Sequence, residues 1–189
     1  MSRWEPNARG RLEQAALDLF GERGFEQTTA AQIAERAGLT ERTFFRHYAD
    51  KREVLFGEAH TLEQAFVDTF TGIPDTVAPI DAMASALETI AARYFDPRHE
   101  RVRQRHAVIM ANAELREREL IKLASLSAAL VAALRRRGIE PSAAHLTAEV
   151  GIAVFKVGFG RWIGDTGERT LADFFRESLD GLRVVIAGG

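Results

Sequence analysis

A short polar segment near the start of the chain carries side chains that can read the edges of bases. Residues 40–48 are Thr-Glu-Arg-Thr-Phe-Phe-Arg-His-Tyr. On a helix, Phe44 and Tyr48 fall four residues apart and face inward together, which leaves the other side chains on or near the outer surface. There, Arg42 can donate to guanine and Phe45 can contact a thymine methyl group. This chemistry is that of a short helix lying in the major groove of DNA.

The residues around this segment predict the helices that would position it. Thr29 begins a short helix, and Gln32 three residues later completes a capping box. Gly38 and the residue after it make a turn, and Thr40 caps the next helix. Two short helices joined by a glycine-containing turn form the plan of a helix-turn-helix. Capping alone would account for both threonines, so a three-helix subdomain that binds no DNA stays an alternative at this point.

The rest of the chain also has a helical pattern, without sustained strand-like alternation. A first helix over 7–23 ends at Gly24, and Asp50 caps a fourth helix that ends before Pro74. Lys51, at the start of that fourth helix, can bind a phosphate together with the free helix N-terminus. Five more helices are expected at approximately 80–95, 98–110, 114–137, 142–163 and 171–186.

We therefore predict an all-α fold of about nine helices. A three-helix helix-turn-helix domain would occupy residues 1–52, and a larger helical domain would occupy residues 53–189. The composition changes at Gly72 to Pro79, although the fourth helix is expected to bridge the two parts.

Three stretches of the N-terminal quarter share the pattern of one regulator family. They are Ala-Ala-Leu-Asp-Leu-Phe-Gly-Glu-Arg-Gly-Phe at 15–25, Thr-Thr-Ala-Ala-Gln-Ile-Ala-Glu-Arg-Ala-Gly-Leu-Thr at 28–40 and Arg-Thr-Phe-Phe-Arg-His-Tyr-Ala-Asp-Lys at 42–51. Over about residues 9–60 the chain resembles the TetR-family transcriptional regulators. The resemblance implies contacts with operator DNA from Thr29, Thr40, Glu41, Arg42, Thr43, Phe45, His47 and Lys51. The family often has Gly or Lys where this chain has Glu41 or Arg42, so the base sequence that is read does not carry over.

The same resemblance implies a homodimer on a palindromic operator, most often a repressor that a small-molecule effector releases. It also implies that the last two helices pair with a second subunit, while earlier helices of the C-terminal domain line an effector pocket. The last two helices have broad apolar faces, which fits pairing with a second copy. The expected interface residues are Leu146, Val150, Val154, Val157, Phe174, Ser178 and Leu182.

Aromatic and methionine side chains at helical spacing supply the candidates for an effector pocket. They are Phe66, Phe70, Tyr94, Phe95, His106, Met110, Phe155, Phe159 and Trp162. The same side chains can also be ordinary core, and His106 can either orient a ligand or be a hydrogen-bonded core histidine. The segments 44–46 and 114–120 resemble a TetR subgroup associated with acyl-CoA-like molecules. A hydrophobic or acyl-CoA-like effector is therefore one expectation.

Composition restricts the other function classes. The formal net charge is −2, and residues 1–51 hold eight basic and eight acidic side chains. Bulk charge therefore gives no support to nucleic-acid binding, and it is the one feature that favours a helical adaptor without DNA-binding activity. The sequence holds no cysteine, which excludes disulfides and thiolate metal sites. It also lacks a nucleophile elbow, a phosphate loop and metal-ligand spacing, so we expect no enzyme, metal or cofactor.

The hydropathy pattern indicates where in the cell the protein is expected. No apolar stretch approaches the roughly 18 residues that a membrane-spanning helix needs. Residues 1–5 open no secretory hydrophobic run. From the sequence we expect a cytoplasmic protein with no membrane partner.

Overall fold

The computed structural model describes residues 7–188, which excludes 1–6 and 189. The described residues form helices with short connections and no strand, so the all-α prediction is confirmed. They divide into two compact units, 7–59 with 103–119 and 60–102 with 120–188. The domain boundary expected after residue 52 stays a prediction. The expectation that the chain has no secretory leader depends on residues 1–5, which lie outside the described residues.

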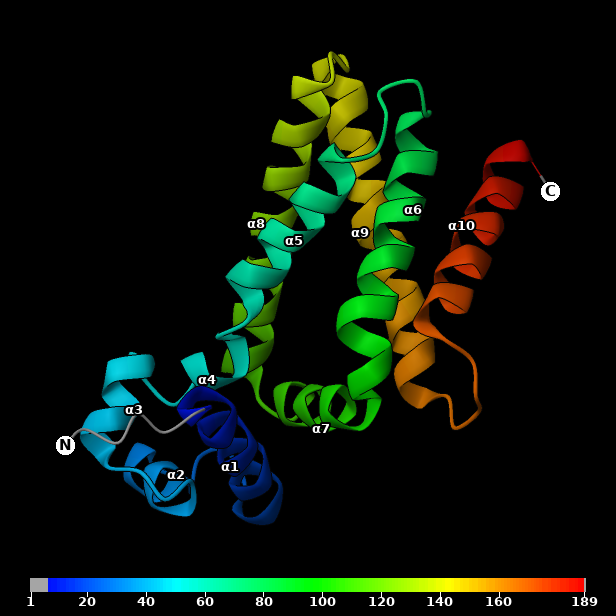
Figure 1. The fold of residues 1–189 in the computed structure, drawn as a ribbon. Helices are drawn as coiled ribbons and strands as arrows, with labels where there is room; N and C mark the ends of the chain where they lie inside the picture. The colour runs from blue at the N-terminus through cyan, green and yellow to red at the C-terminus, as the bar shows by residue number, and fades with distance from the viewer. Residues whose placement is uncertain (1–6, 189) are drawn as a thin grey trace. The chain divides into compact units, whose positions relative to one another are not determined.

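The first unit is built on four N-terminal helices (Figure 1). They are α1 (Ala8–Arg23), α2 (Ala30–Arg36), α3 (Glu41–His47) and α4 (Glu53–Phe56). Leu12 of α1, Ile33 of α2 and Phe44 of α3 have no exposed surface and meet in one apolar core. Val108, Ile109 and Leu115 complete that core from residues 103–119.

Short-range caps fix where these helices begin. The Thr29 hydroxyl accepts from the Gln32 amide at 3.2 Å, and the Gln32 side chain accepts from the Thr29 amide at 3.0 Å. Thr40 accepts from the amide of Thr43 at 3.2 Å. Gly38, at φ 67°, supplies the left-handed residue that the turn between α2 and α3 requires. The expected capping box and glycine turn are therefore confirmed.

The helix expected from Asp50 to Gly72 is in fact divided. α4 ends at Phe56, Gly57 and Glu58 form a turn, and α5 runs over Ala59–Thr71. The Arg9 guanidinium donates to the carbonyl oxygen of Gly57, which gives that carbonyl a partner outside the helix. Glycine also has a low helix propensity, so the break falls where the local helical preference is weakest.

The second unit contains the longer helices (Figure 1). They are α5, α6 (Pro79–Ile90), the start of α7 (His99–Met110), most of α8 (Ala113–Arg136), α9 (Pro141–Gly164) and α10 (Leu171–Ala187). α6, α9 and α10 pack against one another, and Thr170 and Asp173 form a capping box at the start of α10. No helix of the described residues is long and apolar enough to span a membrane.

The end of α6 differs from the single helix expected over 80–95. Residues Ala91–Phe95 form a π-helical turn, η1, in which the Asp96 amide donates to the carbonyl of Ala91. A 3-10 turn, η2, follows over Asp96–Arg98. Pro97 has no amide proton for a helical hydrogen bond, so the helix cannot continue regularly. The Asp96 carboxylate then accepts from the Leu171 amide at 2.9 Å and fixes this corner to α10.

Candidate functional site

α3 has one buried and one exposed face, as its residue spacing predicts. Phe44 and Tyr48, which follows the helix, are buried. Phe45 keeps 53% of its surface exposed, which is unusual for a large apolar ring. The other side chains exposed around it are Glu41, Arg42, Arg46 and His47, with Thr43 half-buried. The exposed face of the helix therefore carries two arginines, a histidine, one carboxylate, a hydroxyl group and an aromatic ring.

Tyr48 fixes the end of α3 to α1. Its hydroxyl donates to the Glu13 carboxylate at 2.8 Å in a buried position, and the same carboxylate oxygen accepts from Arg9 at 3.3 Å. Burial and the bond to Glu13 raise the pKa of Tyr48 well above its ordinary value, so the phenol stays a donor. Sequence reasoning missed Glu13, because a lone acid on a helix is usually solvent-exposed.

Ion pairing in the first unit leaves positive charge on α3. Glu22 accepts two hydrogen bonds from Arg36, at 2.9 and 2.8 Å, and these lower the pKa of Glu22. Glu13 is likewise bonded within the unit. The side chains of Arg42 and Arg46, by contrast, have no hydrogen bond or ion pair to any residue the structure describes. A balanced charge count therefore coexists with unpaired cations on the exposed face of α3.

The remaining predicted DNA contacts have different surroundings. Thr29 and Thr40 are exposed, and the Thr40 and Thr43 hydroxyls lie 3.0 Å apart. Lys51 is half-buried, and its ammonium donates to three backbone carbonyl oxygens of the segment between α1 and α2. The structure thus places the threonines at helix starts on the surface and turns Lys51 inward.

Two arginines from residues 103–119 hold α4 in place. Arg105 donates to the Leu55 carbonyl at 2.7 Å and makes a two-bond pair with Glu119, at 2.9 and 3.2 Å. The guanidinium groups of Arg105 and Arg118 lie 5.1 and 5.8 Å from the centre of the Phe56 ring. Further ion pairs join the same segments, namely Arg52 with Glu114 and Arg118 with Glu53. Sequence reasoning missed this cluster, although its charge alternation is visible at 114–119.

The predicted pocket residues are divided between the two units. Met110 is 43% exposed and belongs to the first unit, as does the half-buried His106. Burial lowers the pKa of His106. The core of the second unit holds Phe66, Phe70, Phe95, Phe159 and Trp162, with Tyr94 and Phe155 partly buried against it. The pocket itself stays a prediction.

The described part of the second unit has packed aromatic rings and a groove. Phe95, Phe155 and Phe159 lie with ring centres 5.5–5.9 Å apart, so these side chains fill space against one another. The groove, about 280 Å³ including open solvent, lies between α6, α9 and α10. Its apolar lining includes Met83, Leu87, Gly151, Val154, Phe175 and Leu179, and none of the predicted pocket residues.

The predicted dimer residues form three groups, which are exposed, buried and partly buried. Leu146 and Val157 keep 66% and 54% of their surface exposed. Val154 and Phe174 are only 5% and 3% exposed, because α9 and α10 pack together and bury them in their own unit. The partly buried members are Val150, Ser178 and Leu182.

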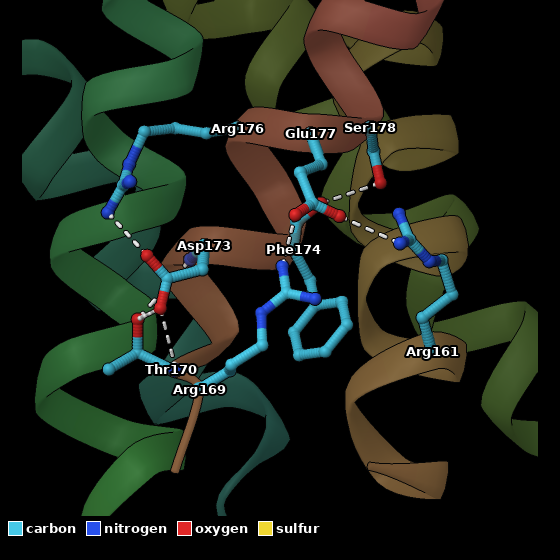
Figure 2. A network of polar contacts seen from close by, with 8 residues as sticks. All are labelled: Arg161, Arg169, Thr170, Asp173, Phe174, Arg176, Glu177 and Ser178. Atoms are coloured by element: carbon cyan, nitrogen blue, oxygen red, sulfur yellow. Dashed lines mark hydrogen bonds and ion pairs between the residues drawn. The ribbon is translucent and has the colours of Figure 1, made fainter. Parts of the chain in front are cut away.

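Polar contacts enclose Phe174 (Figure 2). The guanidinium groups of Arg161 and Arg169 lie 5.3 and 4.2 Å from its ring centre. Both arginines pair with Glu177, whose pKa is lowered first by the hydrogen bond from Arg161. Phe174 is therefore a core residue under an ion-pair cluster, and it offers no surface to a second chain.

These features define a helix-turn-helix protein in which α3 has an exposed face, with a second helical unit. Residues 13–57 match the model of the bacterial regulatory proteins of the TetR family, and residues 77–187 match the MftR C-terminal domain. The second match covers more than half of the chain, and the chain belongs to the TetR family of regulatory proteins.

Individual relatives agree with this assignment. The chain is 38% identical over 88 residues to the HTH-type transcriptional regulator TcmR of Streptomyces glaucescens, a match covering 47% of this chain and 39% of TcmR. It spans between 39% and 60% of the length of the curated relatives that it matches. Solved structures also share the fold, and two of them are described next.

One is the TetR-family repressor FadR of Thermus thermophilus in complex with lauroyl-CoA, at 22% identity and a TM-score of 0.57, covering 91% of each chain. The other is the complex of triclosan with SmeT, the repressor of the Stenotrophomonas maltophilia efflux pump SmeDEF. That likeness has 23% identity and a TM-score of 0.65, and covers 95% of this chain and 90% of SmeT.

Proposed function

We propose that this chain is a transcriptional repressor that binds a palindromic operator as a homodimer and is released by a small-molecule effector. It would act in the cytoplasm, where operator DNA is accessible, and have no enzymatic activity. The reading surface would be the exposed face of α3, with Thr29 at the start of α2 and Thr40 at the start of α3.

The observation that carries the proposal is the surface of α3. The side chains of Arg42 and Arg46 have no partner among the described residues, so no ion pair must be broken for them to contact DNA. Phe45 is exposed beside them, where it can contact a thymine methyl group or a sugar. A solvated structural helix has no need for this combination.

A dimer is supported by an apolar stripe on α9. Leu146, Val150 and Val157 recur at helical spacing, and Gly160 continues the stripe in an exposed position. A glycine inside a helix costs about 1 kcal/mol relative to alanine. A Cβ at Gly160 would meet no atom within 4 Å, so the subunit itself gives no reason for glycine there. The close approach of a helix from a second copy of the chain would explain a glycine at this position.

For the effector, we propose a hydrophobic or acyl-CoA-like molecule. The second unit is rich in buried apolar side chains, and two proteins of similar fold were solved with lauroyl-CoA and with triclosan. Lauroyl-CoA should raise the melting temperature and dissociate the operator complex. An unchanged melting temperature at a saturating concentration of lauroyl-CoA would exclude a long-chain acyl-CoA as the effector.

DNA binding is tested first on the intergenic DNA beside the chain's own gene, by electrophoretic mobility shift with excess competitor. The proposal predicts a retarded, competitor-resistant complex, and footprinting should locate a palindrome within it. If every neighbouring intergenic fragment fails to bind, the helical adaptor is favoured instead.

A further inference from the structure

The Lys51 ammonium is surrounded by backbone oxygens. Its nitrogen lies 2.8 Å from the carbonyl oxygen of Phe25, 3.1 Å from that of Thr28 and 3.3 Å from that of Glu26. An ammonium group has three protons to donate and no acceptor. The three carbonyls therefore match its complete donor capacity.

An aromatic ring completes this carbonyl cage. The Lys51 nitrogen lies 4.3 Å from the centre of the Phe25 ring, within the range of a cation–π interaction. Phe25 is itself buried and lies against Phe20, with ring centres 5.1 Å apart. The cage is thus built on the core of the first unit and is not a chance surface contact.

The cage joins two segments that bear on the reading surface. On one side, Thr28 is buried and donates its hydroxyl to the Gly24 carbonyl at 2.9 Å, and the next residue, Thr29, caps α2. On the other side, Asp50 accepts from the backbone amides of Arg52 and Glu53, at 2.8 and 3.0 Å, ahead of α4. Lys51 therefore connects the start of α2 to the turn between α3 and α4.

We propose that Lys51 is a positioning residue for DNA binding and not a phosphate contact. It holds the start of α2 against the turn after α3 and so sets how Thr29 and α3 are presented together. The inference rests on the proposed operator binding, and it replaces the phosphate role that the sequence favoured for Lys51. A phosphate would have to displace three carbonyls that are already bonded.

Two substitutions at this position distinguish the roles. Lys51→Met keeps the aliphatic length and the packing on Phe25 but removes charge and donors. Lys51→Arg keeps the charge and would serve a phosphate well, but a planar guanidinium does not reproduce the compact ammonium among three carbonyls. The matched control is Arg46→Met, which removes an exposed cation without a described partner.

The first measurement is operator affinity against salt concentration. Each lost phosphate contact lowers the slope of log K against log salt by about 0.9, and a dimer loses two. We expect both Lys51 variants to bind about tenfold more weakly, the worth of roughly one charge-assisted hydrogen bond, with an unchanged slope. Arg46→Met should have a shallower slope. A shallower slope in Lys51→Met with normal binding by Lys51→Arg would overturn the proposal.

The second measurement needs no DNA. In the free protein, hydrogen exchange at the amides of residues 24–29 should accelerate in Lys51→Met and stay unchanged in Arg46→Met. Unchanged exchange in Lys51→Met would overturn the positioning role even if the chain bound no operator. If exchange accelerates in Lys51→Met but the unmodified chain binds no DNA, the structural role of Lys51 is supported and the proposed function is refuted instead.

Discussion

Arg105 donates from its Nε to the carbonyl oxygen of Leu55 at 2.7 Å, and so joins α7 to α4 across fifty residues of sequence. The same guanidinium makes two hydrogen bonds with Glu119 and lies over Phe56. One side chain therefore connects three elements of the first unit. Arg105 therefore helps to fix the position of α4 within the first unit.

Replacing Arg105 by methionine should destabilise the first unit. Loss of the charged donor leaves the Leu55 carbonyl and the Glu119 carboxylate without partners, which should cost about 2 kcal/mol. Chemical unfolding, monitored by circular dichroism, measures this loss in the free energy of unfolding. Arg116→Met, which changes an exposed side chain on α8 without a described partner, is the control and should change stability by less than about 0.5 kcal/mol. Equal stability of the two variants would contradict the role given to Arg105.

Gly57 should not tolerate even a methyl group. A Cβ there would lie 2.7 Å from both the Arg9 guanidinium and the Tyr48 ring, and the buried ring cannot move aside. Gly57→Ala should therefore cost about 1–3 kcal/mol through overpacking. At Gly21, exposed within α1, an added Cβ would meet no atom within 4 Å. Gly21→Ala should instead stabilise the protein by about 0.5–1 kcal/mol. Chemical unfolding of both variants measures the difference, and a Gly57→Ala variant more stable than Gly21→Ala would refute this contrast.

Stability should fall as the solution becomes mildly acidic. Burial lowers the pKa of His106, with Glu119 opposing that shift and Arg105 adding to it. The folded state therefore binds a proton at His106 less readily than the unfolded state, whose histidine pKa is about 6.5. The contribution of neutral His106 to stability is therefore complete above the unfolded-state pKa. It is lost as the pH falls through the lower pKa of the folded state. The melting temperature should drop as the pH falls below the histidine pKa of about 6.5 in the unfolded chain, and it should drop less in His106→Gln. An identical pH profile in the variant would assign the drop elsewhere.

The exposed face of α9 should determine the oligomeric state. The double substitution Leu146→Glu and Val157→Glu places charge on the apolar stripe, where a desolvated carboxylate is strongly unfavourable. We expect a monomer by analytical ultracentrifugation and unchanged helix content by circular dichroism. Leu120→Glu changes a comparably exposed leucine, 57% exposed, on α8 and should remain dimeric. A double variant that sediments as a dimer would place the interface on another surface.

Features determined by neighbours in sequence were predictable from the residues alone. The caps at Thr29, Thr40 and Thr170 each depend on hydrogen bonds to a residue three positions later. Likewise, the buried positions of Phe44 and Tyr48 follow from the period of a helix. These signals lie within one helical turn, so no tertiary information was needed to locate α3 and its exposed face.

Features that depend on distant partners were not predictable. Nothing local indicates that Tyr48 bonds to Glu13, or that Lys51 finds three carbonyls before α2. The sequence pattern places Val154 and Phe174 in the interface, because a broad apolar stripe does not tell which part faces the subunit's own core. Their burial between α9 and α10 is decided by packing, which the sequence pattern leaves open.

We predict that the exposed face of α3 binds operator DNA, and fluorescence anisotropy with a labelled operator at fixed salt measures this binding. Phe45→Ala and Arg42→Ala should each weaken binding by about 1–3 kcal/mol, up to roughly a hundredfold, without changing helix content or dimerisation. Glu35→Ala, an exposed substitution on α2, serves as the control and should bind as the unmodified chain does. Affinities for Phe45→Ala and Arg42→Ala equal to that of the unmodified chain would show that this face of α3 does not bind the operator.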